Sequence, residues 1–258
     1  MTQPELGVVI LAAGAGTRLG GVAKATLVHE RATYLEHILA KCDAVGVGTR
    51  IVVVGPPHAA EVRVDLERIA RARSRASLES IPSVSRPNLY VVDNPNPERG
   101  MASSISLGFA ELSRAVPRTV TAAFLWPVDH PFVREATLRE LIKAFVDSGH
   151  AATADPDIAL ADTPDPEASD GELRSVTSVE HDLVTSVADT EVVRPRYGEH
   201  GGHPPLVARA VWSALATCAT DPLGARGVLA KRRTRDVLVE DSGVVFDVDT
   251  PADLDPHS

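Results

Sequence analysis

A continuous apolar run near the start of the chain, residues 7–13 (GVVILAA), passes directly into a glycine-rich loop. An uninterrupted apolar segment of this length is typical of a central strand in a parallel sheet, because helices cover both of its faces. The run is too short to cross a bilayer, and no basic segment precedes it as in a signal peptide. We therefore expect the first strand of a buried parallel sheet here.

Further β-rich runs alternate with helix-length segments through the first 150 residues. In the last of these segments, Leu138, Leu141, Ile142 and Phe145 recur at helical spacing. Such alternation predicts an α/β fold with a doubly wound, mostly parallel, Rossmann-like sheet. The expected strands are 50–54, 88–92 and 120–126, and the expected helices are 33–44, 58–73, 103–115 and 135–148.

The second half of the chain is less regular. Residues 154–172 are acidic and rich in proline, so they cannot hold a long helix or a central strand, and we interpret 154–191 as a surface insertion. Doubly wound proteins of 258 residues are usually one domain, so 1–258 is predicted to be a single domain. The elements expected after Val192 complete the same sheet: a helix at 209–218, another after Asp221, and strands at 236–239 and 244–247.

Composition excludes several classes of function. The net charge of −9 argues against a nucleic-acid partner, and the basic stretch 68–75 lacks aromatic side chains and is predicted to be a solvated helix face. No run approaches the ~20 apolar residues of a membrane span. Cys42 and Cys218 lack metal-type spacing and are expected to be free thiols in a reducing compartment. A cytoplasmic protein without a membrane partner is the expectation.

The strongest chemical signal is the loop after the first strand, residues 11–24 (LAAGAGTRLGGVAK). Small residues let backbone N–H groups approach an oxyanion, Arg18 can form paired bonds to phosphate oxygens, and Lys24 supplies a compact positive charge. A dinucleotide fingerprint fits poorly because Leu19 stands at its third glycine, and the chain has no G-K-[ST] P-loop. A plain tight turn is the structural alternative, and a nucleoside triphosphate is the ligand that the loop favours.

This loop resembles the signature of the MobA-like NTP transferases, which include molybdenum cofactor guanylyl- and cytidylyltransferases and sugar-phosphate nucleotidyltransferases. Residues 94–105 (NPNPERGMASSI) are similar to a segment that lies beside the base and sugar in the cytidylyltransferase branch. There Gly100 would turn the chain, and Ser103 or Ser104 would cap the next helix. The nucleotide-binding residues that the resemblance implies are Leu11, Ala12, Ala13, Gly14, Gly16, Arg18, Lys24, Gly100, Ser103 and Ser104.

Two aspartate motifs indicate a metal site. Asp129 (WPVDHP) follows an expected strand, where open α/β sheets bind ligands, and the matching aspartate of the family holds Mg²⁺. Asp247 and Asp249 (FDVDTPADL) would share one face of an extended strand, and the family resemblance places one of them opposite Asp129. Asp249 and Thr250 could instead cap a helix beginning at Pro251. Mg²⁺ is the expected cofactor, with Asp247 slightly favoured as the second ligand.

Two later segments, 201–206 (GGHPPL) and 224–229 (GARGVL), also resemble the cytidylyltransferase branch. The resemblance makes His203 and Arg226 candidates for acceptor binding, although a loop histidine beside proline is often structural. It implies transfer of NMP from an NTP to a phosphorylated acceptor such as molybdopterin, with release of pyrophosphate and with Arg18 and Lys24 as the catalytic cations. A molybdoenzyme or cofactor-insertion protein is a further partner that the resemblance allows.

Other interpretations stay open at this point. The loop spacing is closer to guanylyltransferases and the later motifs to cytidylyltransferases, so CTP is favoured with GTP as the alternative. A sugar-1-phosphate nucleotidyltransferase would share the loop and the aspartates. A non-catalytic nucleotide-binding accessory protein would be expected to have lost Lys24 or the acidic pair, and an NAD-dependent oxidoreductase lacks its fingerprint.

Overall fold

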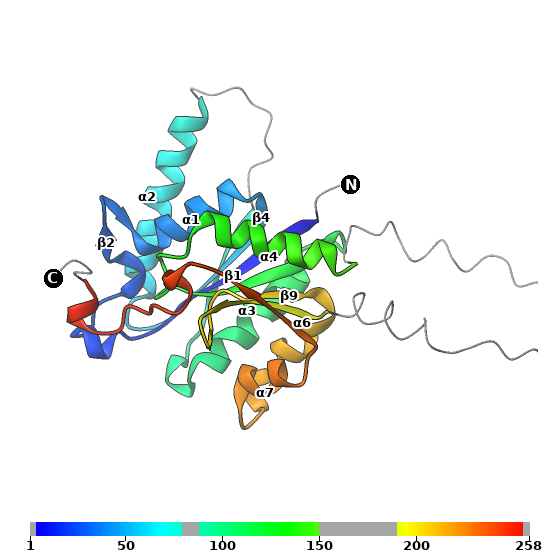
Figure 1. Ribbon diagram of the computed structural model, residues 1–258. Helices are drawn as coiled ribbons and strands as arrows, with labels where there is room; N and C mark the ends of the chain where they lie inside the picture. The colour runs from blue at the N-terminus through cyan, green and yellow to red at the C-terminus, as the bar shows by residue number, and fades with distance from the viewer. Residues whose placement is uncertain (1–3, 79–87, 150–189, 255–258) are drawn as a thin grey trace, which may run out of the picture.

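The computed structural model describes residues 4–78, 88–149 and 190–254, and its centre is one mixed sheet (Figure 1). The strand order is β10-β7-β9-β6-β1-β4-β5, with β8 paired to β7. The strands are β1 (Glu5–Ala12), β4 (Val47–Val54), β5 (Asn88–Asp93), β6 (Val120–Pro127), β7 (Val192–Tyr197), β8 (His200–Gly201), β9 (Leu206–Ala208) and β10 (Thr234–Leu238). A two-stranded hairpin, β2 (Val28–His29) and β3 (Ala32–Thr33), lies apart.

Helices cover both faces of the sheet, as expected for a doubly wound fold (Figure 1). On β1, Val8 and Ile10 pack with α1, α2 and α4, whereas Val9 and Leu11 pack with α3, α6 and α7. The continuous apolar run is therefore buried on both faces, which confirms its interpretation as a central strand. The helices are α1 (Tyr34–Ala44), α2 (Ala59–Leu78), α3 (Met101–Ala115), α4 (Glu135–Asp147), α6 (Arg209–Ala216) and α7 (Gly224–Ala230).

Parallel pairing dominates the first half of the sheet, where β1 lies between β4 and β6 and β4 pairs with β5. In the second half, β9 is antiparallel to both β6 and β7, and β10 is parallel to β7. The carboxyl ends of β1, β4 and β6 consequently meet at one edge of the sheet. This is the edge at which open α/β sheets bind ligands.

Two expectations about the C-terminal part are corrected. The predicted strand at 244–247 is wrong: a 3₁₀ turn, Ser242–Val244, is followed by irregular backbone. The predicted helix at 209–218 ends at Ala216, and a separate 3₁₀ turn covers Cys218–Thr220. The surface insertion proposed for 154–191 lies almost wholly outside the described residues.

Cys42 and Cys218 are both free and buried, in agreement with their interpretation as unpaired thiols. Within the described ranges, no helix combines the length and the apolar character needed to cross a membrane.

Candidate active site

A cavity of about 300 Å³ opens at the carboxyl ends of β1 and β6. Its walls come from segments far apart in the sequence: the loop after β1, the start of α3, the end of β6 and a segment near the C-terminus. The lining residues are Leu11, Ala12, Ala13, Gly14, Gly16, Thr17, Arg18, Lys24, Ala25, Pro97, Gly100, Met101, Ser104, Pro127, Val128, Asp129 and Asp249. The cavity thus gathers the catalytic candidates and nine of the ten nucleotide-binding candidates, all except Ser103.

The loop after β1 closes on itself through Gly16. The carbonyl oxygen of Gly16 accepts hydrogen bonds from the backbone N–H groups of Leu19 and Gly21, at 2.9 and 3.0 Å. Gly16 has a φ of 60°, and a Cβ atom there would lie 1.9 Å from the carbonyl oxygen of Val22. Only glycine fits this position, so the tight turn depends on it. The turn brings Arg18 and Lys24 to the same cavity.

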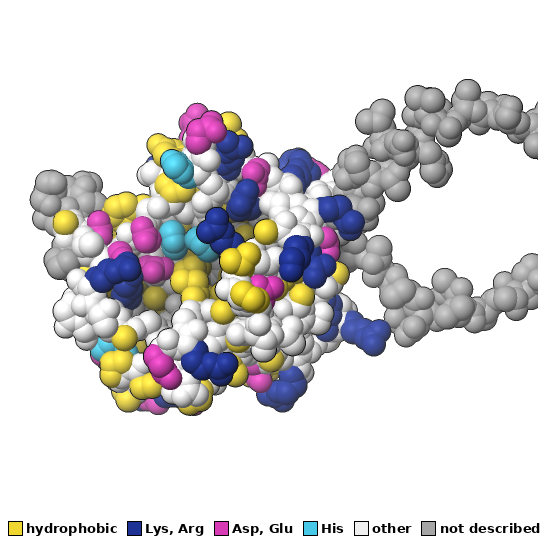
Figure 2. Space-filling model, turned by 90° about the horizontal axis from the view of Figure 1, so that it is seen from below, with side chains coloured by type: hydrophobic (Ala, Val, Ile, Leu, Met, Phe, Trp, Pro, Cys, Tyr) yellow, Lys and Arg dark blue, Asp and Glu magenta, His cyan; other side chains and the backbone are white. Residues whose placement is uncertain are grey.

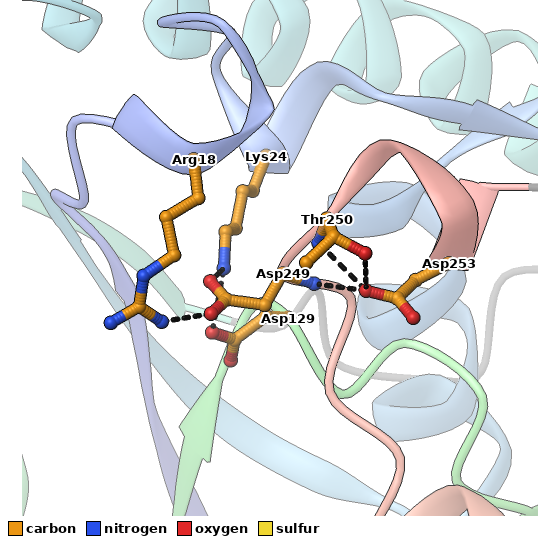
Figure 3. Close-up of polar contacts among 6 residues, drawn as sticks. All are labelled: Arg18, Lys24, Asp129, Asp249, Thr250 and Asp253. Carbon is orange, nitrogen blue, oxygen red and sulfur yellow. Dashed lines mark hydrogen bonds and ion pairs between the residues drawn. The ribbon is translucent and has the colours of Figure 1, made fainter.

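Lys24 lies between two carboxylates (Figure 3). Its Nζ donates to Asp249 Oδ1 at 2.8 Å and to Asp129 Oδ2 at 3.2 Å. Arg18 donates to the other oxygen of Asp249. The Lys24 side chain is only 13% exposed, whereas that of Arg18 is 74% exposed. Lys24 is therefore a fixed cation inside the cavity, and Arg18 reaches in from solvent.

The charges in this group alter one another's protonation. Burial alone would lower the pKa of Lys24, but the hydrogen bonds and charges of Asp249 and Asp129 outweigh it, and the pKa is raised. The Lys24 ammonium, followed by the Arg18 guanidinium, lowers the pKa of Asp249. At neutral pH the cavity therefore holds a charged lysine and a charged Asp249 carboxylate.

Asp249, rather than Asp247, faces the cavity. Because the segment is not a strand, alternation does not apply: Asp247 is exposed and does not line the cavity, Val248 is buried, and Asp249 points inward. The N–H of Val248 donates to the carbonyl oxygen of Asp129 at 2.9 Å, which ties this segment to the end of β6.

The capping role suggested for Asp249 and Thr250 belongs to a different side chain. Asp253 accepts hydrogen bonds from the N–H groups of Asp249 and Thr250 at 3.1 and 2.7 Å, and from the Thr250 hydroxyl at 2.8 Å (Figure 3). Asp253 therefore stabilises the turn at Pro251–Leu254. The carboxylate of Asp249 is left for Lys24 and Arg18.

The other wall of the cavity is the start of α3. Gly100 turns the chain as expected, with a φ of 88°. Ser103 and Ser104, however, lie inside the first turn and do not cap the helix, which begins at Met101. Both hydroxyls accept hydrogen bonds from the side-chain amide of Asn94, at 2.8 and 2.9 Å. This buried asparagine joins the end of β5 to α3, a role that sequence analysis missed although Asn94 opens the motif.

The two acceptor-binding candidates do not line the cavity. The ring of His203 lies 4.9 Å from that of His130, between centroids, and Nδ1 of each ring is buried without a hydrogen-bond partner in the described structure. Burial, and then the charge of His130, lower the pKa of His203 to about 4. Arg226 is exposed on α7, whose first residue, Gly224, packs against Ala102 beside the cavity residue Met101.

We expect His203→Gln to reduce the loss of stability at acidic pH. A neutral histidine with a lowered pKa stabilises the fold fully above its unfolded value of 6.5, and this contribution is lost as the pH falls through about 4. Between pH 7 and pH 4, the free energy of unfolding of the wild type should fall by up to about 3 kcal/mol more than that of the variant. Chemical denaturation at pH 7, 5.5 and 4 measures it, with the exposed His200→Gln as control. If the free energy of unfolding changes equally with pH in wild type and in His203→Gln, the prediction is contradicted.

On the face seen in Figure 2, basic and acidic side chains both occur among uncharged ones. In the basic stretch of α2, Arg68 pairs with Glu36 and Asp65, and Arg71 pairs with Glu67. These arginines have local acidic partners, which agrees with their interpretation as a solvated helix face.

Residues 8–237 match the MobA-like NTP transferase domain. The chain belongs to this family. No curated protein sequence matches it significantly.

Several solved structures share the fold of this MobA-like chain. Rv0371c from Mycobacterium tuberculosis is 24% identical with a TM-score of 0.58, over 98% of this chain and 96% of that one. A structure described as its complex with manganese gives 22% identity and a TM-score of 0.53, over 96% and 95% of the two chains. A nucleotidyl transferase from Methanothermobacter (Mth528) is 18% identical with a TM-score of 0.59, over 96% and 94%.

Several cavity residues of this MobA-like protein carried no signal of their own in the sequence. Thr17, Ala25, Pro97, Met101, Pro127 and Val128 line the cavity. Each lies within three residues of a predicted site residue, so the motifs located the walls without identifying every contact.

Proposed function

We propose that this protein transfers an NMP unit from an NTP to a phosphorylated small-molecule acceptor and releases pyrophosphate. The observation that carries the proposal is the fixed position of Lys24 between Asp129 and Asp249, in a cavity whose floor is a glycine-rich loop. A cation held beside a bound triphosphate stabilises the charge that develops on the α-phosphate and on the leaving pyrophosphate.

In this proposal the loop from Leu11 to Lys24 cradles the triphosphate. Backbone N–H groups of the loop and the guanidinium of Arg18 bind phosphate oxygens, and Lys24 acts at the reacting α-phosphate. Gly100 and Ser104 line the opposite wall, where the sugar and base would lie. Ser103 does not line the cavity, and in this proposal it supports the wall by accepting a hydrogen bond from Asn94.

The donor set of the cavity suits a divalent metal ion. Asp129 and Asp249 offer hard carboxylate oxygens, and Mg²⁺ is usually held by one or two carboxylates together with substrate phosphates. The described residues contain no cluster of three or more His, Cys, Asp or Glu side chains that could hold a metal by themselves. When bound, Mg²⁺ would neutralise phosphate charge. We assign its protein ligands to Asp129 and Asp249, with Asp247 outside the cavity lining.

The reaction needs no general base. An oxygen of the acceptor phosphate, already ionised, attacks the α-phosphorus while the bond to the bridging oxygen of the β-phosphate breaks. Pyrophosphate takes the electron pair of that bond. The protein contributes position and charge through Arg18 and Lys24, which is the main requirement of phosphoryl-type transfers.

CTP is our preferred donor and molybdopterin our preferred acceptor, because residues 94–105, 201–206 and 224–229 resemble the cytidylyltransferase branch. A structural neighbour described as the inositol-1-phosphate CTP transferase of T. maritima, with a TM-score of 0.50 and 14% identity, makes phosphorylated polyols an alternative to test. The deciding experiment incubates the protein with Mg²⁺, each NTP in turn and either molybdopterin or a sugar or inositol phosphate, and measures pyrophosphate. Release with no pair would refute the proposal.

Arg226→Ala should weaken use of the acceptor more than use of the NTP. We propose that this exposed arginine, on the helix beside the start of α3, binds the acceptor phosphate. Loss of one charge-assisted contact of about 1.5–3 kcal/mol predicts a rise of about 10- to 150-fold in the KM for the acceptor. The KM for the NTP should change less than threefold. Arg233→Ala serves as the control, because it removes an exposed arginine immediately before the edge strand β10. Equal changes in both KM values would contradict the assignment.

A further inference from the structure

The two carboxylates that we assign to the metal are already bonded to a cation of the protein itself. The Lys24 ammonium donates to both Asp129 and Asp249, and no other lysine in the described ranges lines the cavity (Figure 3). Its side chain is 13% exposed, so it is held in place rather than mobile in solvent. A divalent cation entering between the carboxylates would have to displace this ammonium or bind beside a like charge.

Such a displacement is unfavourable without a new partner for Lys24. A partly buried ammonium that loses both carboxylates is left without compensation for its lost hydration. Arg18 also bonds Asp249, but its side chain is 74% exposed, so it can leave the carboxylate for water at little cost. A triphosphate changes the balance, since its oxygens give Lys24 a new anionic partner within reach of its flexible stem.

We propose that Lys24 is an internal counter-ion that keeps divalent cations off Asp129 and Asp249 until a triphosphate draws it away. The proposal rests on the proposed function, in particular on the metal role of the two aspartates. It gives Lys24 a second task besides its action on the α-phosphate: it couples metal binding to nucleotide binding. The metal then enters with the nucleotide and not before it.

The test measures binding of Mn²⁺ by electron paramagnetic resonance, without nucleotide and without turnover. Lys24→Met keeps most of the side-chain volume and removes the charge, and it should bind Mn²⁺ at least about tenfold more tightly than wild type. Lys24→Arg keeps the charge and should remain close to wild type. Lys143→Met removes the same charge from an exposed pair with Asp147 on α4, and it should have no effect.

Further variants establish where the ion binds. Adding Asp129→Asn to Lys24→Met should abolish the gain in Mn²⁺ affinity. A raised melting temperature on addition of Mn²⁺, larger in Lys24→Met than in wild type, reports the same binding through the stability of the fold. A gain that survives Asp129→Asn would overturn the proposal, because the ion would then bind elsewhere.

The outcomes also separate this proposal from the proposed function. If wild type binds no Mn²⁺ even with a non-hydrolysable NTP analogue, the metal role of the aspartates fails. If wild type with the analogue binds Mn²⁺ but Lys24→Met shows no gain without it, only the counter-ion role of Lys24 fails. Equal Mn²⁺ affinity of wild type with and without the analogue would likewise exclude the coupling.

Discussion

Asp129→Asn is expected to lower the rate of pyrophosphate release by at least about 10³-fold while leaving the fold intact. The amide has the shape of the carboxylate but lacks the charge that holds a cation, and metal assistance contributes several kcal/mol, with each 1.4 kcal/mol worth a factor of ten. The fold should survive because the contact that Val248 makes is to the backbone carbonyl of Asp129, which the change does not touch. Steady-state kinetics over a range of Mg²⁺ concentrations measure the loss.

Two variants serve as controls for that result. Asp147→Asn removes a carboxylate from an exposed pair with Lys143 and should leave the rate unchanged. Asp247→Asn should change it by only a few fold, since Asp247 is exposed and outside the cavity lining. Substantial Mg²⁺-dependent activity in a folded Asp129→Asn protein would refute the metal assignment.

Lys24→Ala is expected to lower kcat by about two to three orders of magnitude, with a smaller effect on the affinity for NTP. Negative charge moves toward the leaving oxygens as the bond to the α-phosphorus breaks, so a fixed cation acts most strongly late in the reaction. The magnitude is the range observed when one preorganised charge-stabilising group is removed. Comparison of kcat with the Kd for NTP distinguishes the two effects.

Arg18→Ala provides the contrast to Lys24→Ala. Its guanidinium is largely exposed and bonds Asp249 from solvent, so it should affect NTP binding as well as turnover. If Lys24 merely paired with a carboxylate for stability, kcat in Lys24→Ala would stay within a few fold of wild type. That outcome would remove Lys24 from the reaction and weaken the functional interpretation of the whole loop.

The parallel half of the fold could be predicted because its signals are local. The apolar run 7–13 and the periodic residues around Leu138 each specify one element; the run is buried, and so are Leu138, Leu141 and Phe145. The short strand β9 could not be found in the same way, since its three residues follow His203 and two prolines in a segment without alternation. Its pairing with β6 depends on tertiary contacts that no window of sequence contains.

In the site, too, the motifs could be predicted from local sequence, whereas the roles of single residues depend on contacts between distant segments. The motif around Asp247 and Asp249 was visible, but the choice between them required the backbone, because alternation assumes a strand and this segment is irregular. Ser103 and Ser104 are predicted to be caps, but the helix begins at Met101 and places both inside its first turn. Asn94 was within a recognised motif, yet its role depends on where α3 packs against the end of β5.

The contact between Arg18 and Asp249 spans 231 positions of the chain. During synthesis the glycine-rich loop that carries Arg18 therefore leaves the ribosome long before the carboxylate of Asp249. Contacts of such long separation form late in folding, because the loop that they close costs entropy before the contact repays it. A nascent chain can assemble β1 and its neighbours while Lys24 still lacks one of its two anionic partners. The complete charged group of the cavity therefore needs both the first strand with its loop and the segment around Asp249 in place.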